Sequence, residues 1–115
     1  MDDGTPDGTF GTAGAVSTFV SDLGDVAEAV AVQEDGKILV SGRSSIMTNS
    51  NFALARFEST GALDDDFGFN GRMSVDFFGY TDSADSVAVQ TDGKIVLGGL
   101  ARDNVDGYGL ARVLP

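Results

Sequence analysis

The chain of 115 residues carries a formal net charge of −11, contains 42% hydrophobic residues, and has neither cysteine nor histidine. This length corresponds to one ordinary domain, and this composition is that of a folded protein. The negative charge argues against nucleic acid and anionic membranes as partners. Without cysteine and histidine the chain has no disulfide, thiol nucleophile, imidazole acid–base group or zinc site of the usual kind.

The first residues, Met1 to Gly4, are acidic and polar. They do not form a signal peptide, which needs a basic start and an apolar stretch. No run reaches the roughly 18 apolar residues that mark a membrane-spanning helix. We expect either a protein that stays inside the cell or a mature or excised piece of a longer protein.

Eight short strands are predicted, because runs rich in β-branched and aromatic residues alternate with clusters of Gly, Asp and Asn. In chain order they cover residues 15–20, 26–33, 37–43, 51–57, 72–78, 83–90, 94–101 and 107–113. The last four repeat the first four: Asp-Gly-Lys-Ile at 35–38 returns at 92–95, which is 57 positions later. The chain is therefore predicted to contain two units, residues 1–60 and 61–115, each a linker followed by a sheet.

The second and third strands of each unit are joined by Glu34-Asp35-Gly36 in the first and by Thr91-Asp92-Gly93 in the second, so that the pairs Asp35-Gly36 and Asp92-Gly93 recur. An Asp-Gly pair accepts the positive φ angles of a type I′ turn, whose twist matches that of the flanking strands. Both pairs are therefore predicted to form structural hairpin turns. The fourth strands repeat at an offset of 56, because Leu-Ala-Arg at 54–56 returns at 110–112.

The strands carry apolar residues on both faces. Val30 and Val32 lie on one side of the second strand and small alanines on the other, while residues 38–40 of the third strand are apolar throughout. A sheet of this kind is packed on both faces. The predicted fold is all-β, with two four-stranded antiparallel β-propeller blades per chain.

The linkers at 4–14 and 61–71 are also copies of each other. Each contains one phenylalanine, Phe10 or Phe67, which is predicted to fill the gap between adjacent blades. Glycines at matching positions allow a tight backbone path. Their spacing is not that of a phosphate-binding loop, and no helix pattern follows.

One arginine recurs at a fixed place in the fourth strand, as Arg56 and Arg112. An arginine in a buried blade needs a carboxylate partner. Asp7 and Asp64, which lie at matching positions in the two linkers, are the candidates. The alternatives are a solvated arginine and a contact to a ligand.

Three motifs occur in order in the chain: Val-Ala-Val-Gln-x-Asp-Gly-Lys-Ile, Leu-Ala-Arg and Gly-x-Leu-Asp-x-x-Phe-Gly. Together they resemble the delta-sixty repeat, although Pro6 stands in the first copy where Leu63 stands in the second. The resemblance implies a bacterial β-propeller domain of unknown function, which occurs in tandem and often in surface or secreted proteins. It implies no activity and supplies no catalytic residue.

Two blades alone would leave two apolar faces in water. The C-terminal end of the repeat continues almost in phase into its N-terminal end, which favours association of copies head to tail. Two blades per chain give an even total, so that six blades would make a homotrimer and eight a homotetramer. A filament that does not close and a longer array are the alternatives.

The loops that differ between the copies lie at one end of the blades, and variable loops are a common place for binding. Their amides, carboxylates and one aromatic ring are suited to a glycan or protein ligand, and ordinary polar loops are the alternative. The candidate ligand-binding residues are Asn49, Asn51, Tyr80, Asp103, Asn104 and Asp106.

The run Asp64, Asp65 and Asp66 supplies oxygen ligands of the kind that calcium takes, without the spacing of an EF-hand. Calcium is therefore a candidate cofactor, and no other cofactor is expected. The only catalytic chemistry left to this composition is a pair of carboxylates, as in glycosidases. Adjacent aspartates in a repeated linker are better explained as a charged turn, so we expect a protein that is not an enzyme.

Overall fold

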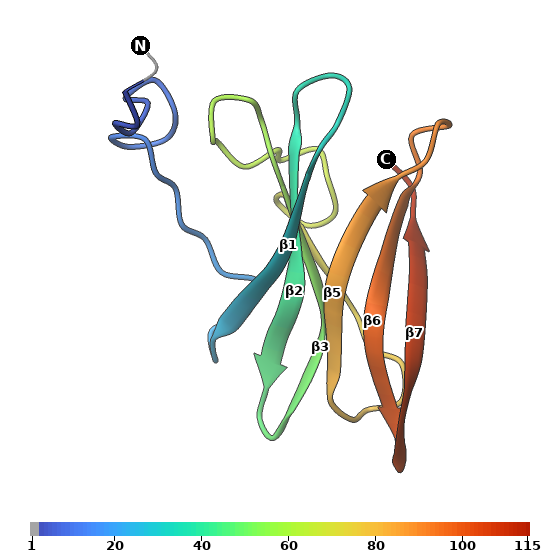
Figure 1. Ribbon diagram of the computed structural model, residues 1–115. Helices are drawn as coiled ribbons and strands as arrows, with labels where there is room; N and C mark the ends of the chain where they lie inside the picture. The colour runs from blue at the N-terminus through green and yellow to red at the C-terminus, as the bar shows by residue number, and fades with distance from the viewer. Residues whose placement is uncertain (1–2) are drawn as a thin grey trace.

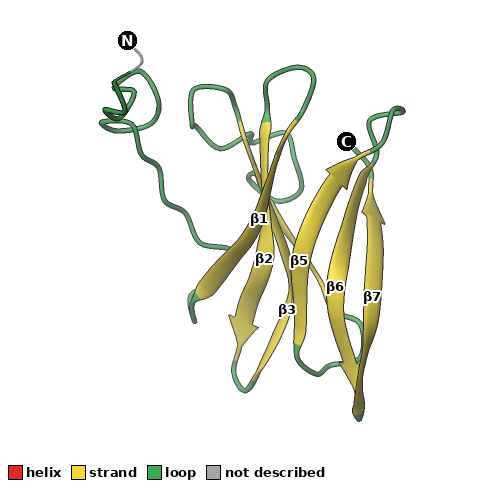
Figure 2. Ribbon diagram, in the orientation of Figure 1, coloured by secondary structure: helices red, strands yellow, loops and turns green. Residues whose placement is uncertain are grey.

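The computed structural model describes residues 3–115 as seven antiparallel strands in two sheets that lie face to face (Figures 1 and 2). The first sheet has the order β1-β2-β3-β4 and the second the order β5-β6-β7. The strands are β1 (Asp25–Val32), β2 (Ile38–Ile46), β3 (Asn49–Phe57), β4 (Arg72–Val75), β5 (Asp82–Val89), β6 (Ile95–Asp103) and β7 (Val105–Val113). The predicted all-β fold of propeller blades is confirmed. Over this part of the chain no helix is long and apolar enough to cross a membrane.

The two sheets have the same strand register and share a β-bulge at the same position. β1 pairs with β2 and β5 pairs with β6 in the same register, and each pairing is interrupted by a β-bulge, at Ala27/Ala29 and at Ala84/Ser86. A glycine faces each bulge. A Cβ atom at Gly42 would collide with the backbone carbonyl of Val26. Glycine is therefore required there, because the bulged strand crosses its neighbour too closely for a side chain.

Both Asp-Gly pairs form hairpin turns, as predicted, but the turn type differs from the prediction. Three residues, not two, separate Gln33 from Lys37, and the Gly36 N–H donates to the Gln33 carbonyl at 3.0 Å. Among these residues only Gly36 has a positive φ, of 89°. The geometry is that of a type I turn followed by a left-handed glycine, which needs one positive φ where a type I′ turn needs two.

The β2–β3 and β6–β7 hairpins account for the change of offset from 57 to 56. In the first hairpin two residues turn the chain between the paired Ile46 and Asn49, whereas Asn104 alone lies between the paired Asp103 and Val105. The strands run further than predicted, so the loops expected at 44–50 and 102–106 are tight turns. Paired backbone extends into them because it satisfies the N–H and C=O groups there.

The strand after each linker does not begin its own blade, contrary to the prediction. β4, at the start of the predicted strand 72–78, pairs with β3 and is therefore the fourth strand of the first blade. The first blade thus takes one strand from the second repeat unit, and the units 1–60 and 61–115 do not coincide with the sheets. The second blade has three strands, and the predicted strand 15–20 forms only isolated bridges at Ala15. Residues 16–20 pair with no strand within residues 3–115, although the outer edge of β1 is free.

The core lies between the two sheets. Leu39, Phe52 and Leu54 of the first blade meet Ile95 and Leu97 of the second. Phe52 also meets Phe77 edge to face, with ring centroids 4.8 Å apart. One sheet-on-sheet interface therefore supplies the main hydrophobic core of the chain.

Candidate functional site: the faces that join blades

The interface between the two blades uses a different face of each sheet. The first blade contributes Phe52 and Leu54 of β3, which are 0% and 1% exposed. Their repeat counterparts on β7, Tyr108 and Leu110, are 104% and 73% exposed. The second blade therefore carries the same apolar face as the first, and no other part of residues 3–115 covers it.

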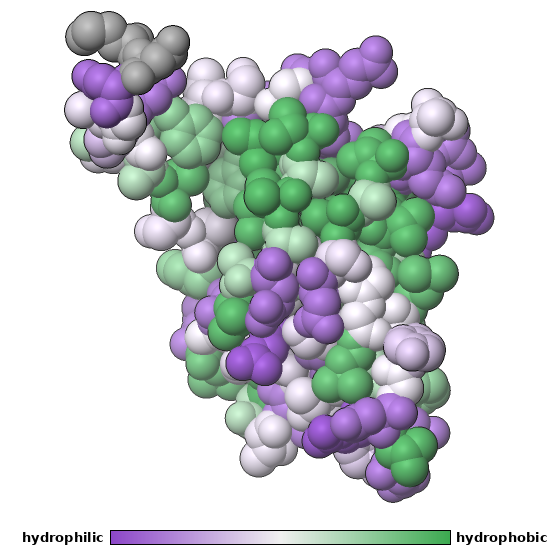
Figure 3. Space-filling view, viewed as in Figure 1, coloured by the Kyte–Doolittle hydropathy of each residue, from purple (hydrophilic) through white to green (hydrophobic). Residues whose placement is uncertain are grey.

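On the opposite face of the sheets, the side chains of the second blade are covered and their counterparts in the first blade are exposed. Val87 and Val89 of β5 are partly buried and pack against the core between the blades. Val30 and Val32, their counterparts on β1, are 65% and 68% exposed. Figure 3 shows apolar residues gathered over the upper halves of β1 and β5. The chain thus contains one complete interface between blades. Each of the two sheet faces that form this interface also occurs a second time in the chain, where it is uncovered.

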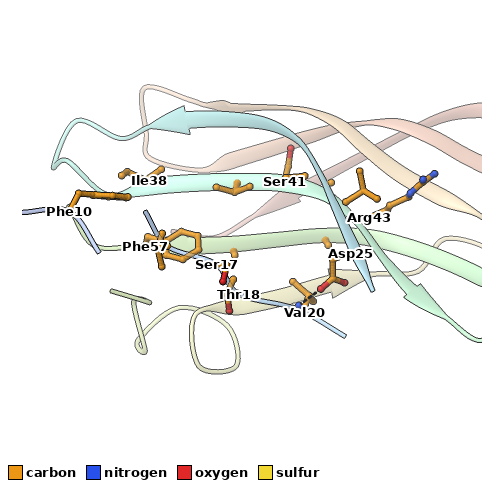
Figure 4. Close-up of a pocket in the computed structure, with 16 residues that line it drawn as sticks. Phe10, Ser17, Thr18, Val20, Asp25, Ile38, Ser41, Arg43 and Phe57 are labelled. Atoms are coloured by element: carbon orange, nitrogen blue, oxygen red, sulfur yellow. Dashed lines mark hydrogen bonds between the residues drawn. The ribbon is translucent and has the colours of Figure 1, made fainter. Parts of the chain in front are cut away.

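A hollow lies over the uncovered face of the first blade, between that sheet and the segment that precedes β1 (Figure 4). Ile38 and Val40 of β2 line its floor, and Phe10 and Val16 contribute from the N-terminal segment. Figure 4 shows Phe10 near Ile38 at one end of the hollow. Polar and charged side chains also line it, namely Ser17, Thr18, Asp25, Ser41 and Arg43.

A buried charge cluster ties the linker to the first blade. The Arg56 Nε atom lies 2.6 Å and the Lys37 Nζ atom 2.7 Å from Oδ2 of Asp64, whose side chain is 2% exposed. Lys37 also contacts Glu58 at 3.1 Å. The Arg56 guanidinium lies 4.3 Å from the centroid of the Phe67 ring. The predicted partnership of Arg56 with Asp64 is therefore present, and Phe67 is buried beside it.

These contacts perturb the titration of the cluster. Hydrogen bonds from Lys37 and Arg56 hold the pKa of Asp64 below its ordinary value, against the opposing effect of burial. Hydrogen bonds to Asp64 and Glu58 raise the pKa of Lys37. Both groups are therefore charged across the whole neutral range.

The second blade has the cations of this cluster without its anion. Arg112 is exposed and has no carboxylate partner within residues 3–115, and Lys94 contacts only Asp92, at 3.2 Å. Asp7, the other candidate partner of the recurring arginine, accepts hydrogen bonds from the backbone and hydroxyl of Thr9, at 2.9 and 2.7 Å. Within residues 3–115 Asp7 therefore pairs with neither arginine.

Two aspartates that the sequence did not single out fix the backbone of the segment that leads into each blade. The buried Asp82 carboxylate accepts backbone N–H bonds from Phe77 at 3.0 Å and from Arg102 at 3.2 Å. Asp25, its counterpart, accepts a bond from the Val20 N–H at 2.7 Å. Their separation of 57 positions was the signal that could have identified them, since both begin a repeated strand.

The first group of candidate ligand residues lies around the β2–β3 and β4–β5 turns, at one end of the first blade. The Asn49 side chain donates to the Gly79 carbonyl at 2.7 Å, so its amide is already used in holding two turns together. The Oδ1 atom of Asn51 is buried without a hydrogen-bond partner. Tyr80 is 43% exposed. These residues thus lie around neighbouring turns at one end of the first blade.

The second group lies at the tip of the β6–β7 hairpin and is not joined to the first. Asn104 donates to Asp103 at 3.2 Å, and Arg102 forms an ion pair with Asp106 at 2.7 Å. Asp106 also lines the shallow hollow over the uncovered face of β6 and β7. The acidic run in the linker is divided as well, because Asp64 is buried while Asp65 and Asp66 are exposed. Over residues 3–115 no three acidic side chains are grouped so that they could hold a metal ion.

The comparisons with known proteins agree with the fold. A family model described as a β-propeller domain of unknown function, DUF5122, matches residues 33–67 and 90–115. These ranges cover the Asp-Gly hairpin of each unit and the linker that contains Asp64 and Phe67. No curated protein and no solved structure matches the chain.

Proposed function

The chain belongs to the DUF5122 family of β-propeller domains of unknown function, and we propose that it is a non-enzymatic scaffold whose blades join head to tail with those of other copies. In this proposal the uncovered face of the second blade packs on the uncovered face of the first blade of the next copy. The contact is heterologous, because each copy offers two different surfaces.

The observation that carries this proposal is the contrast in burial between repeat counterparts. Phe52 and Leu54 are buried by the neighbouring blade, while Tyr108 and Leu110 are exposed at the same positions of the next sheet. The uncovered side chains would each gain roughly 1.5–3 kcal/mol on burial. Several of them together amount to on the order of 10 kcal/mol, which is comparable with the stability of a whole domain.

A closed ring would contain an even number of blades. We infer a ring of six or eight blades, which corresponds to a homotrimer or a homotetramer. The more specific resemblance to the delta-sixty repeat supports this, because tandem arrays of that repeat would use the same blade-to-blade contact. It also supports a bacterial surface or secreted location as part of the proposal.

The decisive experiment is light scattering coupled to size exclusion on the full chain. We expect three or four times the mass of one chain, with no dependence on dilution through the micromolar range. A folded species with the mass of a single chain at all concentrations would overturn the scaffold proposal.

Binding of a glycan or protein ligand by the turns at one end of the blades stays a prediction. A glycan array probed with the intact protein separates the two functions, because a scaffold alone gives no bound glycan. Alanine substitution of Tyr80 is the matched variant, since this side chain is exposed beside the turn that Asn49 holds.

A further inference from the structure

The segment at residues 5–18, which we name the N-terminal module, is a folded copy of the linker and β4 at residues 62–75. The Phe10 N–H donates to the Asp7 carbonyl at 3.0 Å, as the Phe67 N–H does to the Asp64 carbonyl. The Gly14 N–H donates to the Phe10 carbonyl at 3.0 Å, and its counterpart bond measures 2.7 Å. The module therefore repeats the backbone turns of residues 62–75, although no strand pairs with its end.

The backbone angles of the two segments agree at the positions that need unusual conformations. Ala13 and Asn70 have φ values of 54° and 51°, and Gly14 and Gly71 have values of 83° and 84°. A left-handed alanine is unfavourable, and surrounding contacts must hold it. The segment at 5–18 thus keeps a specific conformation even though no strand pairs with its end.

The linker and β4 at residues 62–75 show what this conformation does in the structure. There β4 pairs with β3 in the register Phe52↔Val75 and Leu54↔Met73. The Arg56 N–H donates to the Gly71 carbonyl at 2.8 Å. The linker and β4 together complete the edge of the first blade and neutralise its buried arginine.

The second blade lacks this element. β7 is the last strand of its sheet, and nothing within residues 3–115 pairs with its outer edge. Arg112 and Lys94 stand where Arg56 and Lys37 stand in the first blade, without an equivalent of Asp64. An unpaired strand edge of this kind is a template for another chain.

The N-terminal module does not complete the blade of its own chain. Its Gly11 N–H donates to Thr60 at 2.8 Å, and its Val16 lines the hollow over the far face of the first blade. Figure 1 shows the module beside β1, with the first blade between it and β7. Within residues 3–115 the β7 edge is thus free to pair with another copy of the repeat.

We propose that the N-terminal module of a second copy docks on the outer edge of β7 and completes the second blade. This inference rests on the proposed head-to-tail scaffold and names the segment that makes the contact. Counterpart positions give the register, in which Thr18 lies opposite Tyr108 and Val16 opposite Leu110. Asp7 of the second copy then lies between Arg112 and Lys94, and Phe10 of the second copy packs beside Arg112.

Disulfide trapping tests the register, since the chain has no cysteine of its own. The Thr18→Cys and Tyr108→Cys variants, one with a larger tag, are mixed under mild oxidation. Residues directly opposite each other in a sheet have Cβ atoms about 4.5–5.5 Å apart, which is near what a disulfide requires. We expect a cross-linked dimer of mixed size. The control is Ser17→Cys mixed with Tyr108→Cys, because adjacent residues point to opposite faces of a strand.

A yield from the Thr18 mixture several-fold above that of the Ser17 control supports the docking. Equal yields, while light scattering still shows an assembly, would overturn the docking and leave the scaffold proposal standing. A single-chain mass without any cross-link would overturn both.

A second measurement tests the charge contact. Asp7→Lys is expected to weaken association by at least about tenfold, because it places a cation between two others. Asp3→Lys is the matched control, since Asp3 accepts the same kind of hydrogen bonds, from Thr5 at 3.0 and 2.7 Å. Pairing Asp7→Lys with Arg112→Glu should restore association. Equal weakening by Asp3→Lys and Asp7→Lys, without rescue, would show a general effect of charge and refute the contact.

Discussion

Phe52 and Tyr108 occupy the same position in two copies of one repeat, yet Phe52 is 0% exposed and Tyr108 is 104% exposed. The difference does not come from the strand register, since Phe52 lies opposite Arg43 and Tyr108 lies opposite its counterpart, Leu100. It comes from the neighbouring sheet, which covers one and not the other. Counterpart residues of this kind allow folding and assembly to be tested separately.

Replacing Phe52 with alanine is expected to lower the free energy of unfolding by about 3–5 kcal/mol, since it leaves a cavity in the core. Urea unfolding followed by circular dichroism measures the change. Tyr108→Ala is the matched variant and should reduce the assembled fraction in light scattering at a concentration where the wild-type protein is assembled. Equal destabilisation of dissociated chains by both variants would contradict the assignment of Tyr108 to an intermolecular face.

Asp64→Asn is expected to cost about 2–4 kcal/mol of unfolding free energy, because it leaves the Arg56 guanidinium and the Lys37 ammonium without their shared anion. Chemical unfolding at neutral pH measures this loss. Asp65→Asn changes the same type of side chain at an exposed position one residue away, and should change the unfolding free energy by less than about 0.5 kcal/mol. A loss as large for Asp65→Asn would mean that the charge of the linker, and not the buried cluster, is what matters.

The cluster also predicts a pH dependence. The lowered pKa of Asp64 means that the unfolded chain binds a proton more readily than the folded one, so stability falls as the pH drops below the ordinary value of 3.8. The raised pKa of Lys37 has the opposite sign, and its contribution is lost only as the pH rises above the ordinary value of 10.5. Unfolding midpoints measured across this range should show a plateau between the two limits.

Comparison with Asp64→Asn isolates the carboxylate in that profile. The difference in unfolding free energy between the wild-type protein and this variant should be largest at neutral pH and shrink on acidification. A difference that stayed constant down to about pH 2 would show that titration of Asp64 does not contribute.

Gly42→Ala is expected to destabilise the first blade severely, because its Cβ would overlap the Val26 carbonyl at the β-bulge. We expect a loss of about 2 kcal/mol or more, of the size found where a substitution strains the backbone. Gly8→Ala is the control, since nothing lies within 4 Å of the added Cβ there. Thermal unfolding of the two variants measures the contrast, and similar melting temperatures would be inconsistent with a close crossing at the bulge.

Calcium is expected to leave the melting temperature unchanged. The Asp64 carboxylate is already bound by two cationic side chains, and Asp65 and Asp66 are exposed. A calcium titration followed by differential scanning calorimetry, with magnesium as the reference ion, gives the answer. A rise of several degrees that saturates with calcium alone would establish a site at this linker.

Much of the fold could be predicted from spacing alone. The 57-residue repeat, the hairpins at Asp35-Gly36 and Asp92-Gly93, and sheets apolar on both faces follow from residue types and their alternation. The turn type was wrong because a three-residue connection favours a type I turn followed by a left-handed glycine, whereas a type I′ turn has two residues. The partner of Arg56 was predictable because Asp64 recurs in register with Asp7.

The sequence by itself determined that the chain repeats, that each unit makes antiparallel hairpins, and that both faces of each sheet carry apolar residues. These properties depend on local propensity and on periodicity, which a single chain displays directly. Only the tertiary structure decided that β4 joins the preceding blade, so that within residues 3–115 the outer edge of β7 and the end of the N-terminal module have no strand partner. That outcome depends on which strand edge is free within reach of the linker, and a free edge exists only once the sheets have formed.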